Sequence, residues 1–161
     1  MTDPDRIAAL KSTKLAQELT ESQVATLAPL ITLRRLAPGE VLVKEGPSDN
    51  HLYVIVTGNL RVVRGAGSAD EVTLFVLSAG DLVGELSFID GTERYASLVA
   101  VDDAQVLGLE REKLESLLPT HPEIVYRVMR AILRTVHQIQ RRLSIQSVEL
   151  TNYIYKQHGR Y

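Results

Sequence analysis

Residues 83–97 have the sequence VGELSFIDGTERYAS and separate two apolar runs, one at 72–77 and the other at 98–101. Both runs have the composition of β-strands, so the segment between them is predicted to be an insert in a sheet. Residues 86–90 have room for about one helical turn. Asp90-Gly91 is a turn signal that ends this helix.

The chemistry that this insert favours is the binding of an anion. The first N–H groups of a short helix have no partners within the helix and point beyond its N-terminus. Gly84 allows a ligand to approach the backbone closely, and the guanidinium fork of Arg94 would complete a phosphate cradle. Glu85 would repel a phosphate, but a carboxylate can accept hydrogen bonds from a ribose hydroxyl. Phosphate, ribose and close backbone contact together indicate a nucleotide.

Gly84-Glu85-Leu86-Ser87, with Arg94 ten residues after Gly84, resembles the phosphate-binding cassette of the cyclic nucleotide-binding domain family. This family includes the catabolite activator protein and the regulatory subunits of protein kinase A. The resemblance implies that Glu85 holds the ribose 2′-OH and that Arg94 holds the cyclic phosphate. It implies this set of nucleotide-binding residues: Gly84, Glu85, Leu86, Ser87, Arg94, Tyr95 and Ala96.

Tyr95 departs from the family pattern, in which the residue after the arginine is usually small. Its backbone N–H can still serve the phosphate, whereas its ring could crowd the pocket, stack on a base or point away. The choice of ligand therefore stays open: cAMP is expected, with cGMP as the alternative.

The rest of the chain indicates a mainly β fold with flanking helices. Short strands separated by glycine-containing turns are typical of a sandwich or barrel. Strands are expected at about 41–43, 51–56, 60–63, 71–77, 95–101 and 105–109. A further set of residues resembles the family's β-roll, or jelly roll: Pro38-Gly39-Glu40, Glu45-Gly46, Leu52-Tyr53-Val54-Ile55 and Gly58.

Three parts are expected along the chain. Residues 1–35 are predicted to be an N-terminal helical segment, in which Thr20-Glu21-Ser22-Gln23 resembles a capping box and Pro29 ends or kinks a helix. Residues 36–118 form the β-roll with its cassette. Residues 119–161 form a long dimerisation helix with a tail.

The final helix is predicted to run from Pro122 to about His158, because this stretch contains no glycine and no later proline. Apolar and polar positions follow a heptad spacing typical of a coiled-coil seam: Ile132, Val136, Ile139, Leu143, Gln146, Leu150 and Tyr153. We therefore expect a parallel homodimer through residues 122–158. The alternative is a helix that folds back on its own barrel.

The family resemblance also implies that polar residues on this helix can contact the base. The candidates for such a lid are Thr135, Gln138, Gln140 and Arg141, and the alternative for each is a solvated surface position. Paired hydrogen bonds from side-chain amides to a purine edge would be the means of recognition.

Charge divides the chain into two parts. Residues 1–123 carry 19 acidic and 11 basic side chains, a net charge of −8, and residues 124–161 carry one and seven, a net charge of +6. The sum is the −2 of the whole chain. The final helix is thus a basic element attached to an acidic body. Charged flanks of a dimer seam are the favoured explanation, and non-specific attraction of nucleic acid or anionic lipid is the alternative.

Several other classes of function are not expected. The chain has no cysteine, and only His51 among its four histidines lies in the strand region, so neither a metal site nor an enzyme is predicted. About 15 residues follow Gln146, too few for a helix-turn-helix, so sequence-specific DNA binding is not expected. There is no membrane span and no secretory signal, which favours a cytoplasmic location.

The sequence therefore predicts a dimeric sensor that binds a cyclic nucleotide and signals through its C-terminal helix to an effector protein not encoded in this chain. The alternative is a degenerate cassette, in which Glu85 and Arg94 pair with each other. The fold would then be a dimerisation or protein-docking module without nucleotide.

Overall fold

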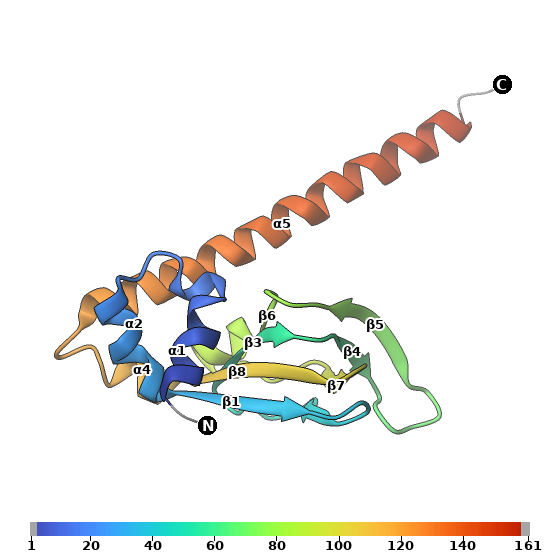
Figure 1. The fold of residues 1–161 in the computed structure, drawn as a ribbon. Coiled ribbons are helices and arrows are strands. Elements are labelled where there is room, and N and C mark those ends of the chain that lie inside the picture. Colours follow the sequence, from blue (N-terminus) through green and yellow to red (C-terminus); the bar gives the residue numbers. More distant parts are fainter. Residues whose placement is uncertain (1–2, 159–161) are drawn as a thin grey trace.

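A computed structural model describes residues 3–158 of the chain, with the side chains of Leu86, Ile139, Leu143, Gln157 and His158 outside the description. In the described part, eight strands form two four-stranded antiparallel sheets, ordered β1-β8-β3-β6 and β2-β7-β4-β5 (Figure 1). The strands are β1 (Ile31–Leu36), β2 (Val41–Val43), β3 (His51–Thr57), β4 (Leu60–Arg64), β5 (Val72–Leu77), β6 (Leu82–Val83), β7 (Ser97–Ala100) and β8 (Ala104–Glu110). The expected roll with flanking helices is confirmed.

The N-terminal segment contains α1 (Asp3–Lys11), α2 (Glu21–Leu27) and the 3₁₀ turns η1 (Lys14–Ala16) and η2 (Ala28–Leu30). The capping box is present: Thr20 Oγ1 accepts from the Gln23 N–H, and Gln23 Oε1 accepts from the Thr20 N–H at 3.0 Å. As predicted, α2 ends just before Pro29, which lies at the start of η2.

Two strand boundaries differ from the sequence prediction. Residues 31–35, assigned to the helical segment, belong to β1, which pairs with β8 from Ile31↔Leu109 to Leu36↔Ala104. The partner strand lies more than 60 residues away, so no local pattern reveals the pairing. The strand expected from Tyr95 begins instead at Ser97, because Arg94 forms an isolated bridge with Gly46 before the continuous ladder starts.

The chain crosses between the two sheets at the cassette. β6 pairs with β3 in one sheet, β7 pairs with β2 and β4 in the other, and α3 (Glu85–Asp90) lies between them in sequence. Phe88 of α3 is 1% exposed and belongs to the core cluster that includes Leu52, Val54 and Leu107. The cassette is therefore packed on the roll by its own apolar side chain.

The helices after the roll are α4 (Arg111–Glu115) and α5 (Pro122–His158), and α5 is one helix of 37 residues, as predicted. Its first part packs on the body through Ile124, Val128 and Ala131. Its second part projects away from the roll (Figure 1). None of the helices in residues 3–158 has the length and apolarity that crossing a bilayer requires.

The predicted seam needs one correction. Ile132 is 1% exposed and Val136 is partly buried, and both pack in the core of their own chain. The alternative of a helix that folds back is therefore right for the first part of α5, whose apolar stripe covers one end of the roll. Leu150 and Tyr153 remain exposed, while the seam side chains of Ile139 and Leu143 lie outside the described residues.

Candidate functional site

The cassette has the local structure that its sequence predicts. Gly84 has φ 81° at the N-cap of α3, and Gly91 has φ 76° at its C-cap, where the Gly91 N–H donates to the Ser87 carbonyl at 3.0 Å. Both backbone conformations are ones that residues with a Cβ rarely adopt. Two glycines thus fix the position and the length of the single helical turn.

Arg94 is the central side chain of the site and is 7% exposed. Its Nη2 donates to the His51 carbonyl at 2.6 Å and to Asp49 Oδ1, with which it forms an ion pair. Its Nε is buried and has no hydrogen-bond partner in the described part of the chain. A buried cation with an unused donor is costly, and an anionic ligand would satisfy it.

Gly84 and Arg94 are in close contact. A Cβ added at residue 84 would lie 1.8 Å from Arg94 Nη1 and 2.7 Å from its Cζ. The guanidinium therefore lies directly against the backbone that begins α3. Glycine at this position is required both by the positive φ and by the space that Arg94 occupies.

Sequence reasoning missed the acidic partner of Arg94. Asp49 Oδ2 accepts from the Tyr53 hydroxyl at 2.9 Å, and Asp49 Oδ1 accepts from the His51 N–H at 3.2 Å. Tyr53 also places its ring 5.8 Å from the Arg94 Cζ. Asp49 lies in a turn cluster 45 residues before Arg94, so no local spacing could have revealed the pair.

The pKa values of Asp49 and Tyr53 are shifted by burial and by the charges of this network. Burial alone would raise the pKa of the Asp49 carboxyl, but the hydrogen bond and charge of Arg94, with donors from His51 and Tyr53, bring it below its usual value. Burial raises the pKa of the Tyr53 hydroxyl, and the adjacent Asp49 charge raises it further. At neutral pH, Asp49 is thus an anion that binds Arg94, and Tyr53 is a neutral donor.

The other predicted cassette residues take different environments. Glu85 is partly buried at the start of α3, and the ion pair of Arg94 is with Asp49 instead of Glu85, so the postulated Glu85–Arg94 pair is wrong. Ser87 is buried, and its hydroxyl is hydrogen-bonded to the Ser48 hydroxyl. The side chain of Leu86 lies outside the described residues.

Tyr95 does not fill the site. Arg94 and Ala96 are buried whereas Tyr95 is 59% exposed, so the three residues alternate in direction as in an extended strand. The Tyr95 ring lies beneath the Arg64 guanidinium, whose Cζ is 5.8 Å from the ring centroid. Of the three orientations left open by the sequence, the ring takes the one that points away from Arg94.

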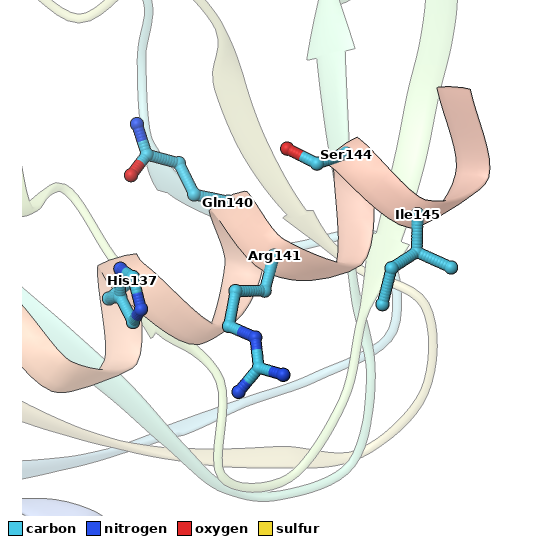
Figure 2. Close-up of a pocket in the computed structure, with 5 residues that line it drawn as sticks. All are labelled: His137, Gln140, Arg141, Ser144 and Ile145. Atoms are coloured by element: carbon cyan, nitrogen blue, oxygen red, sulfur yellow. The ribbon is translucent and has the colours of Figure 1, made fainter. Parts of the chain in front are cut away.

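The lid candidates are on the projecting part of α5. Gln138, Gln140 and Arg141 are exposed, whereas the Thr135 hydroxyl is buried and donates to the Ala131 carbonyl at 3.0 Å. Figure 2 shows a hollow lined by His137, Gln140, Arg141, Ser144 and Ile145, and an adjacent hollow includes Gln138. Residues of α5 alone line both hollows, so this conformation does not bring the lid candidates to the cassette.

Known proteins resemble this chain in both sequence and fold. The model of the cyclic nucleotide-binding domain family matches residues 33–121, which is more than half of the chain. The chain belongs to this family. A cyclic nucleotide-binding domain is a regulatory binding module rather than a catalytic one.

Individual relatives support the assignment. The chain is 33% identical over 117 residues to the cyclic AMP receptor protein of Thermus thermophilus, a match that covers 72% of this chain and 54% of that protein. It is 30% identical to the N-terminal domain of a transcriptional regulator from Streptomyces coelicolor, with a TM-score of 0.66 and coverage of 81% and 94%. A cyclic nucleotide-binding domain from Methylobacillus flagellatus shares the fold, with a TM-score of 0.75, 24% identity and coverage of 87% and 80%.

The match with the receptor protein covers only part of that protein, so its whole activity is not carried over to this chain. The chain spans about half the length of the receptor protein that it matches. Within residues 3–158, α5 continues as one helix to His158, and no helix-turn-helix follows the roll. No cluster of three or more potential metal ligands occurs in the same described range.

Proposed function

We propose that this chain binds a cyclic nucleotide, with cAMP as the expected ligand and cGMP as the alternative, and acts by binding rather than by catalysis. The observation that carries the proposal is the buried Arg94 guanidinium, whose Nε has no partner among the described residues and whose Nη1 lies against Gly84. A cyclic phosphodiester has one negative charge and two free oxygens. It matches a cation with donors to spare beside an exposed stretch of backbone.

The proposed roles follow from the positions of the side chains. Arg94 would bind the phosphate through Nε and Nη1, because both hydrogens of Nη2 serve Asp49 and His51. Glu85 would accept hydrogen bonds from the ribose 2′-OH. Backbone N–H groups near Gly84 and Tyr95 would complete the phosphate contacts, and Ala96 would leave room for the ligand.

We further propose that α5 forms a parallel homodimer and passes the signal to an effector protein. Beyond the core of its own chain, the helix exposes apolar side chains, among them Leu150 at 61% and Tyr153 at 59%. A second copy of α5 would cover Leu150 and the other exposed apolar positions of this stripe. Phosphate capture would order α3 and reposition the helices after Leu109. The proposal keeps the cytoplasmic location expected from the sequence.

Isothermal titration of the chain with cAMP, cGMP and cyclic dinucleotides tests the ligand. Arg94→Ala is expected to weaken binding of the true ligand at least tenfold, since it removes the charge-assisted hydrogen bonds. Arg61→Ala is the matched control, because Arg61 of β4 forms an ion pair with Glu71 away from the cassette. Equal affinities in the two variants would contradict the assigned role of Arg94.

One observation favours the alternative of a module without nucleotide. Arg94 already has an anionic partner in Asp49, so its charge is compensated without a ligand. If none of the nucleotides titrates, the fold serves dimerisation or docking of a partner protein.

The dimer is tested separately by sedimentation of a chain that ends after Val136. Ending the chain at Glu123 would remove Ile124 and Val128 and so open the core, whereas ending it after Val136 leaves the packed part of α5 in place. The proposal predicts a dimer for the full chain and a folded monomer for the shortened one. A shortened chain that still dimerises would place the interface elsewhere.

A further inference from the structure

We infer that the projecting part of α5 docks an amphipathic helix of a partner protein, whose acidic side chains lie against Arg141 and whose apolar side chains lie against Val148. The inference rests on the proposed function and deepens it, because it names the chemistry of the effector segment that docks. The surface is a row of residues seven positions apart on α5, which we call the outer row: Arg127, Arg134, Arg141, Val148 and Tyr155.

The outer row faces away from the predicted dimer seam. At about 100° per residue, Arg141 and Val148 lie about 180° and 160° around the helix from Leu150 of the seam. Positions opposite the seam of a coiled coil face solvent and are normally polar. Val148 is 60% exposed and Tyr155 is 74% exposed, and the proposed dimer would leave both uncovered. Their apolar character therefore calls for a different partner.

The first two arginines of the row show which groups this face binds. Arg127 Nη1 donates to the Glu18 carbonyl at 2.7 Å, and Arg134 Nη1 forms an ion pair with the Glu18 carboxylate. Arg130 Nε lies 3.4 Å from the second oxygen of the same carboxylate. One carboxylate thus faces two guanidiniums, so positive charge is in excess here. The N-terminal segment supplies oxygen acceptors to the start of the row.

Arg141 repeats this chemistry where the helix has left the body. It lies two turns, about 10 Å, beyond Arg134 and forms no ion pair within residues 3–158. Figure 2 shows Arg141 and Ile145 on one side of the helix and Gln140 and Ser144 on the other. Arg141 and Ile145 line the same hollow, and Ile145 is 54% exposed. A charged donor and an apolar side chain are thus adjacent on the surface.

The change from basic to apolar along the row favours a protein helix over a phosphate surface. A nucleic acid or a layer of lipid headgroups carries negative charge along its whole contact, and Glu149, which follows Val148, would repel it. A membrane-surface helix has a broad apolar face, whereas Val148 and Tyr155 form one narrow row. A partner helix with acidic residues at one end and apolar residues at the other matches both ends of the row.

Selection of a phage-displayed library of helical peptides on the full chain tests this surface. The selected peptides should carry acidic and apolar residues about two turns apart. Arg141→Glu and Val148→Asp should each weaken their binding about tenfold or more in fluorescence anisotropy, because each places a repelling or unpaired charge under one end of the peptide. The controls are Arg35→Glu on β1 and Val72→Asp on β5, which add the same charges on exposed strand positions.

A library that gives no peptide sensitive to both α5 variants overturns the inference. Vesicles containing phosphatidylserine and a short DNA duplex are measured with the same variants, and their binding should be unchanged by Val148→Asp. If this substitution weakens binding of vesicles or DNA as much as that of the peptides, the outer row belongs to a lipid or nucleic acid surface and the inference is wrong.

Calorimetry and sedimentation separate the docking surface from the proposed function. Val148→Asp should keep both the nucleotide affinity and the dimer, since Val148 lies away from Arg94 and opposite the seam. If the natural chain binds no nucleotide or sediments as a monomer while both α5 variants still lose the peptides, the proposed function fails and the docking surface stands. If nucleotide and dimer are as proposed but no peptide depends on the outer row, the docking surface alone fails.

Discussion

At the scale of single residues, the proposed site depends on Arg94, whose guanidinium contacts Asp49 and His51 and would also contact the ligand. Arg94 is buried, and one of its nitrogens is held by Asp49 and the His51 carbonyl. Its Nη1 lies toward Gly84, where the backbone has φ 81° and no side chain, and its Nε has no partner in the described part of the chain. In the proposed function, one guanidinium thus uses Nη2 for contacts within the chain and Nη1 and Nε for the ligand. Gly84 and Asp49 are therefore the residues whose substitution should reveal how Arg94 is placed.

Gly84→Ala is expected to impair ligand binding more than folding. The backbone strain at φ 81° should cost about 1–2 kcal/mol of unfolding free energy. The new Cβ would also meet Arg94 Nη1 and push the guanidinium out of its position, so nucleotide affinity should fall at least tenfold. Urea unfolding and calorimetry measure the two effects.

Gly67→Ala provides the matched control for that substitution. Gly67 has φ 80°, and a Cβ there would meet no atom within 4 Å. It should lose a similar amount of stability and keep its affinity. Similar affinities in the two variants would show that contact between Gly84 and Arg94 does not matter to the ligand.

The stability of the protein should depend on Asp49 at acidic pH. The pKa of Asp49 is lowered from 3.8 in the folded protein, so its contribution is complete above about pH 4 and is lost as the pH falls through the folded value. The difference in melting temperature between the natural chain and Asp49→Asn should thus be largest near neutral pH and shrink below about pH 4. A constant difference between pH 3 and pH 7 would contradict an ionised Asp49.

At the scale of elements, α5 consists of two parts with different neighbours. From Ile124 to Ile132 it contributes buried side chains to the core of its own chain. From about Ile145 onward it exposes apolar side chains at both Leu150 and Val148, which face different directions on the helix. One helix therefore anchors the roll at one end and has exposed apolar side chains at the other.

Leu150→Asp is expected to dissociate the dimer. Leu150 lies on the stripe that continues from Ile132, and a carboxylate there would be buried without a partner in the seam. Val148→Asp is the control, since Val148 is equally exposed, 60% against 61%, but lies about 160° away around the helix. Sedimentation should show a monomer for the first and a dimer for the second. The reverse result would place the interface on the opposite face of α5.

At the scale of the whole molecule, one core joins the N-terminal helices, one end of the roll, the cassette and both C-terminal helices. The cluster includes Leu27 of α2, Phe88 of α3, Leu114 of α4 and Ile124 of α5. Arg127 adds a polar contact, because its Nη1 donates to the Glu18 carbonyl at 2.7 Å. We therefore expect a shift of the cassette or of α4 to repack side chains around the base of α5.

Ile124→Ala is expected to lower the free energy of unfolding by about 2–5 kcal/mol, because Ile124 is fully buried where α5 meets this core. Ile145→Ala is the control, since that isoleucine is 54% exposed on the projecting part, and it should change stability by less than about 0.5 kcal/mol. Urea unfolding of the two variants measures the difference. Equal losses would mean that the first part of α5 is not packed as described.

Much of this architecture could be predicted from local patterns. The glycine-bounded turn at 84–91, the capping box at Thr20 and the unbroken helix to His158 each depend on residues within one or two turns of each other. β1 escaped prediction because its partner β8 is distant in sequence. The division of α5 into a packed first part and a projecting second part was not predicted either. A heptad pattern looks the same whether its apolar side chains pack on another chain or on the roll of the same chain.

By itself, the sequence determined most of the elements and the family, and it singled out Glu85 and Arg94, to which the proposed function assigns the ligand contacts. Only the tertiary structure decided what Arg94 contacts without a ligand, because Asp49, His51 and Tyr53 reach it from a turn and a strand more than 40 residues away. It also decided that the Tyr95 ring faces outward. The physical reason is the same in both cases: local preference fixes φ and ψ, whereas the partner of a buried charge depends on which strands lie side by side.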